Sequence, residues 1–168
     1  AIHKPSAQHV LDEDYYKRIE AIQFTMSHDD GKKLDDIEKA DIVLLGVSRT
    51  SKTPTSMYLA NRGYKTANIP LVLDQKIPDK LKSKNNKTCI IGLVTDPERL
   101  ADVRRNRVTI MKENNIKENT DINVIKEEIN TSKKLFKKYN WPIIDVTRKS
   151  VEESAASILK IFEIQKSR

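Results

Sequence analysis

Residues 41–53 read Asp-Ile-Val-Leu-Leu-Gly-Val-Ser-Arg-Thr-Ser-Lys-Thr, and this stretch decides the fold. Its aliphatic run at 42–45 is typical of a strand that a parallel sheet buries on both faces. Residues 46–53 then match the phosphate-binding pattern G-x-x-x-x-G-K-S/T, except that Ser51 stands at the second glycine. A helix is expected to follow, with Gly63 as its natural stop. The order of strand, tight loop and helix predicts a phosphate-binding loop.

Each part of this loop has an expected chemical task. Its backbone N–H groups converge on phosphate oxygens, and the following helix adds its positive N-terminal end. We expect Lys52 to bridge the terminal phosphates of a nucleotide and the Thr53 hydroxyl to reach Mg²⁺. Ser51 is small enough to stand where a glycine would let the backbone approach phosphate. The expected nucleotide-binding residues are Gly46, Val47, Ser48, Arg49, Thr50, Ser51, Lys52 and Thr53.

Strands and helices alternate along the rest of the chain. Further strands are expected at residues 66–73, 88–94 and 142–146. Helices are expected over most of the first 40 residues, around 34–37, as a turn at 98–105, from Thr120, and from Ser150, where Glu153 completes a capping box. The alternation predicts an α/β fold, P-loop kinase-like, with a mostly parallel sheet flanked by helices.

Such sheets bind their ligands at the carboxyl ends of the strands. We therefore expect residues 46–53, Asp96 and residues 145–148 to share one rim. We divide the chain into an N-terminal helical segment over 1–40, expected to continue a region absent from this sequence, and a phosphotransferase domain over 41–168.

Composition narrows the function classes. The 168 residues include 31 Lys plus Arg against 24 Asp plus Glu, a net charge of +7, which suits a phosphate ligand, a nucleic acid or an acidic protein partner. Aromatic residues make up only 5%, too few to favour base stacking. No apolar run is long enough to span a membrane. The lone Cys89 is expected to be a buried core thiol, which fits a cytoplasmic protein without structural zinc.

A longer string, residues 46–72, resembles the pyruvate, phosphate dikinase regulatory proteins, whose close relatives regulate phosphoenolpyruvate synthase. Serine or glycine is usual at the Ser51 position in that family. The resemblance extends to residues 27–31, 92–93 and 96–100 and to the pair Arg104 and Arg107. It covers roughly residues 20–165, and members of the family are longer at the N-terminus.

The resemblance implies a bifunctional enzyme whose protein substrate is pyruvate, phosphate dikinase. Such proteins use ADP as the phosphate donor to phosphorylate a threonine in the dikinase active site, which inactivates the dikinase. In the other direction they use inorganic phosphate to remove that phosphate, with pyrophosphate as product. Mg²⁺ is the expected metal, and neither a nucleic acid nor a membrane is an expected partner.

The candidate catalytic residues are Lys52 and the adjacent carboxylates Asp29 and Asp30, one of which would act as general base. Capping of the next helix is an equal alternative for the two aspartates. Asp96 follows an apolar strand and is a candidate, with Thr53, for holding Mg²⁺; capping before Pro97 is the alternative for Asp96.

The densest basic cluster supplies candidate clamps for phosphate or for the target protein. Its members are Arg99, Arg104, Arg105 and Arg107, and a surface role is the alternative for each of them. Arg49 is either a further clamp or a solvent-facing side chain. His28 by itself is expected to be a polar surface residue.

Two other functions remain open on sequence grounds. A small-molecule P-loop kinase that uses ATP would contain its whole acceptor site and need no protein partner. A basic nucleic-acid-binding module would show salt-sensitive binding to DNA or RNA. The choice between dikinase and synthase as target, the identity of the base and the oligomeric state, a homo-oligomer included, are also open.

Overall fold

The chain is described here as a computed structural model. The structure describes residues 5–71, 77–82, 87–110 and 120–167, with the side chains of 5–12 and 107–110 left aside. Its elements, in chain order, are α1 (Pro5–Ser27), the 3-10 turns η1 (Asp29–Gly31) and η2 (Ile37–Lys39), β1 (Ile42–Gly46), α2 (Lys52–Ala60), β2 (Thr66–Pro70), α3 (Asp79–Lys82), β3 (Cys89–Val94), α4 (Pro97–Ile110), α5 (Ile122–Lys138), β4 (Ile143–Asp145) and α6 (Val151–Lys166).

The four described strands form one parallel sheet in the order β2-β1-β3-β4. Gly46 at the end of β1 lies opposite Pro70 of β2, and Val94 of β3 lies opposite Asp145 of β4. The carboxyl ends of all four strands therefore lie along one edge of the sheet. This confirms the expected α/β, P-loop kinase-like fold with a parallel sheet between helices.

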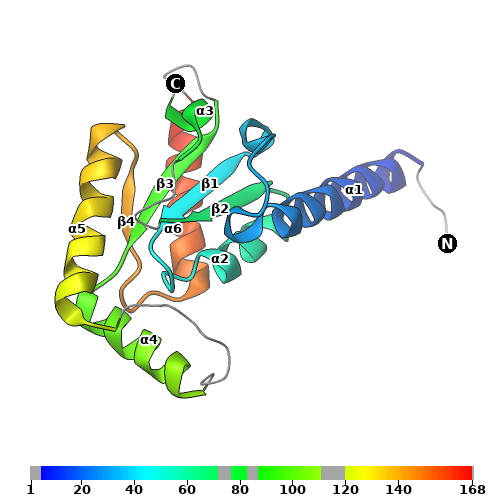
Figure 1. The fold of residues 1–168 in the computed structure, drawn as a ribbon. Helices are drawn as coiled ribbons and strands as arrows, with labels where there is room; N and C mark the ends of the chain where they lie inside the picture. Colours follow the sequence, from blue (N-terminus) through cyan, green and yellow to red (C-terminus); the bar gives the residue numbers. More distant parts are fainter. Residues whose placement is uncertain (1–4, 72–76, 83–86, 111–119, 168) are drawn as a thin grey trace.

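Alternate residues of β1 supply the two faces of the core. Ile42 and Leu44 point to one face, which α2 and α6 cover. Val43 and Leu45 point to the other, which α5, α3 and η2 cover (Figure 1). Complete burial of this strand explains its aliphatic composition. The helix α1 lies outside these two layers and packs against β2 and α2.

The contact between β3 and α5 depends on a glycine. A methyl group on Gly92 would come within 2.3 Å of the ring of Phe136, which is itself fully buried. Real Cβ atoms do not come so close to another heavy atom, so only glycine lets the helix lie this near the strand. The buried thiol of Cys89 starts the same strand, as expected, and burial raises its pKa to about 11.

Several expected boundaries need correction. The turn expected at 98–105 is the start of a longer helix, Pro97–Ile110, and the helix expected around 34–37 is only the 3-10 turn Ile37–Lys39. The second strand ends at Pro70, while residues 72–73 lie outside the described residues. The capping box of α6 is confirmed, with Ser150 and Glu153 as its two members.

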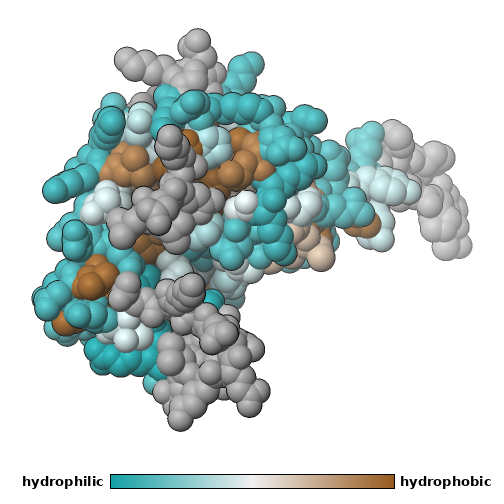
Figure 2. Space-filling view, in the orientation of Figure 1, coloured by the Kyte–Doolittle hydropathy of each residue, from teal (hydrophilic) through white to brown (hydrophobic). Residues whose placement is uncertain are grey.

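The face seen in Figure 2 is mostly hydrophilic, with hydrophobic side chains gathered in small patches. Within the described ranges, no helix combines the length and apolar character that crossing a membrane requires.

Candidate functional site

The loop between β1 and α2 contains two non-glycine residues with a positive φ. Ser51, at the position of the second glycine, adopts the left-handed conformation with φ 61° and ψ 30°. Arg49 also has a positive φ, of 69°. A non-glycine residue in this conformation costs about 1–2 kcal/mol, and such strain is typical of functional sites. Gly46 is needed for a different reason, because a methyl group there would lie 2.8 Å from Thr50 Oγ1.

The side chain of Lys52 folds back over this loop. Only 6% of the residue is exposed, and its Nζ donates a 2.8 Å hydrogen bond to the Val47 carbonyl and a 3.5 Å one to Thr50 Oγ1. Burial lowers the pKa of Lys52 to about 8, an effect that the nearby charge of Asp30 opposes. Among the residues that the structure describes, the hydrogen-bond acceptors of the ammonium group are neutral, and an anionic phosphate oxygen would be a stronger partner.

The two candidate carboxylates do reach this loop, although they lie far from it in sequence. Thr53 Oγ1 donates a 2.8 Å hydrogen bond to Asp29 Oδ1. The same carboxylate oxygen accepts a 2.7 Å hydrogen bond from Asn68 Nδ2. Asp30 is the next residue of the turn, with φ 54°, and its backbone N–H donates to Asn68 Oδ1 at 3.0 Å. The two aspartates therefore lie beside the loop, and their catalytic role stays a prediction.

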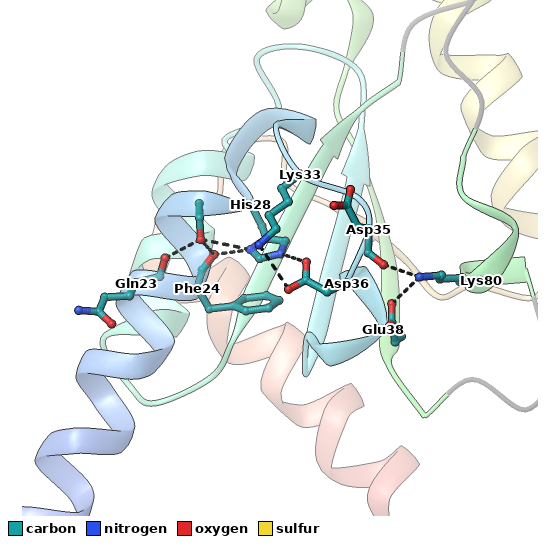
Figure 3. Close-up of polar contacts among 9 residues, drawn as sticks. Gln23, Phe24, His28, Lys33, Asp35, Asp36, Glu38 and Lys80 are labelled. Atoms are coloured by element: carbon teal, nitrogen blue, oxygen red, sulfur yellow. Dashed lines mark hydrogen bonds and ion pairs between the residues drawn. The ribbon is translucent and has the colours of Figure 1, made fainter.

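His28, which begins this turn, is an anchor and not a surface residue. It is 2% exposed and stacks on Phe24 with ring centroids 3.7 Å apart. Its Nδ1 lies 2.7 Å from the Phe24 carbonyl and its Nε2 lies 2.6 Å from Asp36 Oδ1 (Figure 3). The hydrogen bond from His28 lowers the pKa of Asp36, so Asp36 is a carboxylate. Both ring nitrogens therefore lie within hydrogen-bond distance of an oxygen, which holds the ring in place.

This anchor corrects the expectation that His28 is a polar surface residue. The ring is held from both sides, by the last turn of α1 and by the segment that leads to η2. Since Asp29 and Asp30 follow His28 directly, the contacts of the His28 ring fix the position of the start of the turn that carries the two carboxylates. Lys33 adds a longer contact to Asp36, at 3.7 Å.

One of the candidate arginines, Arg104 of α4, contacts the loop between β1 and α2. Arg104 is 2% exposed, and its guanidinium donates to the Ser48 carbonyl at 3.3 Å and pairs with Glu128 at 3.0 Å. A surface role is therefore wrong for Arg104. Arg99 is exposed, and the side chain of Arg107 lies outside the described residues.

Asp96 caps helix α4, because its Oδ2 accepts a 3.1 Å hydrogen bond from Arg99 N. Its own N–H donates to Thr147 Oγ1 at 2.8 Å, which joins the ends of β3 and β4. An open pocket of about 740 Å³ lies here, and its polar and charged lining residues are Thr95, Asp96, Glu98, Arg99, Asp102, Lys133, Asp145, Thr147 and Arg148. The expected rim thus brings Asp96 and residues 145–148 together; a role of Asp96 in holding Mg²⁺ stays a prediction.

The sequence reasoning missed three residues that organise the site: Asn68, Asp36 and Glu128. Asn68 had a usable signal, because it is a polar residue between Ala67 and Ile69 in a segment expected to be a strand of the sheet. A buried amide in such a run must find hydrogen-bond partners, which marks it as structurally or functionally special. Asp36 and Glu128 gave no such signal, since both look like ordinary surface carboxylates.

Comparison with known proteins gives a consistent result. A family described as Kinase/pyrophosphorylase matches residues 1–159. A relative from Pelagibacter ubique is 63% identical over 167 residues, which is 99% of this chain and 61% of the relative. Relatives from Erythrobacter litoralis (49% identical, 98% of this chain, 59% of the relative) and Caulobacter vibrioides (48% identical, 93% of this chain, 49% of the relative) are similar to it too. All three are provisionally named pyruvate, phosphate dikinase regulatory proteins, and the chain spans half to three fifths of their length.

Proposed function

The chain belongs to the kinase/pyrophosphorylase family, and from this premise we propose that it is a bifunctional serine/threonine phosphotransferase that regulates pyruvate, phosphate dikinase. In one direction it transfers the β-phosphoryl group of ADP to a threonine in the dikinase active site and leaves AMP. In the other, inorganic phosphate attacks the phosphothreonine and pyrophosphate leaves. The names of the relatives favour the dikinase over phosphoenolpyruvate synthase as target.

The observation that best supports phosphotransfer is the meeting of Asp29 with Thr53 at the start of α2. A loop that only binds phosphate needs no carboxylate, because carboxylates repel phosphate oxygens. A phosphotransferase does need one, to accept or orient the proton of the attacking hydroxyl group. The contact between the turn that carries Asp29 and Asp30 and the loop residue Thr53 therefore supports a site in which one of the two aspartates would act as base.

The loop residues would share the handling of the transferred phosphate. The backbone N–H groups of residues 46–51 and the N-terminus of α2 would hold its oxygens. Lys52 would exchange its neutral partner, the Val47 carbonyl, for a phosphate oxygen. Arg104 already touches the loop at the Ser48 carbonyl and would add a second positive charge. These charges offset the negative charge that phosphoryl transfer spreads over the equatorial oxygens.

Mg²⁺ would neutralise further phosphate charge, and the oxygen-rich side chains near the loop suit such a cation. The Thr53 hydroxyl lies at the first turn of α2, where this family of loops offers a metal contact. Asp96 stands beyond the end of β3 with one carboxylate oxygen engaged in capping, so its proposed contact to Mg²⁺ would run through water. The nucleoside of ADP would find polar partners in the pocket between the ends of β3 and β4.

A labelling experiment tests the proposal. The purified chain is incubated with phosphohistidine-form dikinase and either ADP labelled in its β-phosphate or ATP labelled in its γ-phosphate. The proposal expects label on the dikinase threonine from ADP alone, and no label with Lys52→Ala. The full-length relative from Pelagibacter ubique serves as a positive control for the assay. Transfer from ATP only, or to a small metabolite, would contradict the proposal and favour a small-molecule kinase.

A further inference from the structure

Asn68 is an unusual residue for its position. It occupies the middle of β2 between the buried residues Ala67 and Ile69, and it is 0% exposed. A buried amide whose hydrogen bonds are not made costs about 1–3 kcal/mol, so the contacts of its side chain decide whether the strand tolerates it. Its side chain leaves the sheet on the side of the Asp29–Gly31 turn, with which β2 makes extensive contact.

Both ends of the Asn68 amide bind this one turn. Its Oδ1 accepts from the backbone N–H of Asp30 at 3.0 Å, and its Nδ2 donates to Asp29 Oδ1 at 2.7 Å. An N–H can only donate and a carboxylate can only accept, so the amide has a single orientation that satisfies both contacts. Ser56 Oγ accepts a weaker bond from the same Nδ2 at 3.3 Å.

The consequences differ for the two aspartates. Asp29 Oδ1 accepts from both Asn68 and Thr53, so this carboxylate is fixed in place. Asp30 is held through its backbone, and the bond to Asn68 stabilises a left-handed conformation that costs about 1–2 kcal/mol for a residue with a side chain. The Asp30 carboxylate is exposed and has no hydrogen bond or ion pair with any residue that the structure describes.

The geometry therefore gives Asp30 two properties that a base needs. Its carboxylate is exposed, and its backbone is held in place by the hydrogen bond to Asn68.

We propose that Asn68 is a positioning residue that separates the tasks of the two carboxylates: Asp29 orients the Thr53 hydroxyl, and Asp30 accepts the proton of the attacking hydroxyl group. The inference rests on the proposed function. In the ADP direction the threonine O–H bond breaks and its proton moves to Asp30. The oxygen bonds to the β-phosphorus, and the bond from that phosphorus to the bridging oxygen breaks, so AMP leaves. In phosphorolysis the protonated Asp30 returns a proton to the leaving threonine oxygen.

Four variants test this division. Asn68→Asp keeps the acceptor for the Asp30 N–H but sets a carboxylate against Asp29. In the double variant with Asp29→Asn, the new amide at position 29 donates a hydrogen bond to the new carboxylate at position 68. The contact between the two positions is thus restored with donor and acceptor exchanged. Asp30→Asn removes the proposed base, and Ser56→Ala removes only the weak third contact of Asn68. For each, kcat and KM for ADP are measured with phosphohistidine-form dikinase, ADP affinity by calorimetry, and exchange of the Asp30 amide proton by NMR.

Asn68→Asp is expected to lower kcat about 10- to 100-fold, the value of one hydrogen bond to a charged group, while ADP affinity stays within about threefold. The double exchange should recover most of that loss. Asp30→Asn should lower kcat about 10²- to 10⁴-fold with ADP affinity retained. Ser56→Ala should change kcat less than about threefold. In Asn68→Asp, repulsion between the carboxylates at positions 68 and 29 should displace the turn. The backbone amide proton of Asp30 should therefore exchange with solvent at least about tenfold faster than in the wild-type chain.

Three results would overturn the inference while the proposed function stands: wild-type kcat in Asn68→Asp, no recovery in the folded double variant, or more than a tenth of kcat retained in Asp30→Asn. If Asn68→Asp does not fold, the Asp30→Asn result and the Asp30 amide exchange in Asn68→Ser decide. A wild-type chain that binds ADP but transfers nothing to the dikinase, beside an active full-length relative, would instead contradict the proposed function of this chain.

Discussion

Lys52 gives the sharpest quantitative prediction, because its charge should be lost within an accessible pH range. Its pKa is lowered from 10.5 to about 8, with burial as the main cause. If only the charged form binds a polyphosphate, the apparent dissociation constant rises by the factor 1 + 10^(pH − pKa). This factor is about 1.1 at pH 7, about 2 at pH 8 and about 11 at pH 9. ADP affinity should thus fall about tenfold between pH 7 and pH 9, which equals about 1.4 kcal/mol.

The sign follows from the direction of the shift. A lysine whose pKa is lowered is partly neutral in the free protein at pH 8, and a bound phosphate anion favours its charged form. Binding at pH 8 should therefore take up about half a proton, whereas a lysine with its ordinary pKa would take up almost none. Titration calorimetry in two buffers of different ionisation enthalpy measures this uptake directly.

Lys52→Arg is the matched control, since arginine stays charged throughout this range. The affinity of that variant should not change between pH 7.5 and pH 9, whatever its absolute value. An affinity of the wild-type chain that is flat over the same range, or an equal decline in Lys52→Arg, would refute the reasoning. The first result would mean that Lys52 is not desolvated, and the second that another group titrates.

Three further predictions concern other parts of the site and core. Gly92→Ala should lower the free energy of unfolding by about 1–3 kcal/mol in urea denaturation, because the new methyl group overlaps the ring of Phe136; an unchanged midpoint would contradict the packing described. Arg104→Met should weaken ADP binding at least about tenfold. It should also lower the free energy of unfolding by about 1–3 kcal/mol, because Glu128 loses its ion pair. Adding Glu128→Met should restore the stability but not the ADP affinity. The lowered pKa of Asp36 means that its stabilising contribution is fully present above its ordinary value of 3.8 and is lost as the pH falls through the lowered pKa. The free energy of unfolding of the wild-type chain should therefore exceed that of Asp36→Asn most at neutral pH, and the difference should shrink in acid; a difference that does not depend on pH would contradict this.

The fold could be predicted from sequence because its determinants are local. The run Ile42–Gly46 reads as a buried strand, and the residues after it form a pattern that few other structures require. The capping box of α6 likewise depends on only two residues, Ser150 and Glu153, which are three positions apart in the sequence. Such signals need no knowledge of what lies across the molecule. Boundaries were less secure, because the last turn of a helix such as α4 depends on what it packs against.

The candidate site was predictable only in part. The loop residues and the aspartates could be named, since short motifs mark them. Which aspartate does what could not, because that depends on Asn68, 38 positions away from Asp30 in the chain. The burial of Arg104 and His28 was missed for the same reason: each is held by a carboxylate from another element, and a charged side chain is buried only where such a partner happens to be near.

The candidate site combines residues from both segments into which we divided the chain, the N-terminal segment 1–40 and the domain 41–168. The carboxylates come from a turn that precedes the first strand. Asn68 of β2 holds that turn, and the Thr66 backbone N–H ties the end of α1 to β2 by donating to the side-chain Oγ1 of Thr25. A recombinant fragment that starts at residue 41 would therefore keep the phosphate cradle and lose the base. Under the proposed function, such a fragment would bind nucleotides without turnover, and grafting the loop onto another α/β scaffold would transfer binding alone. The smallest portable catalytic unit has to include the end of α1.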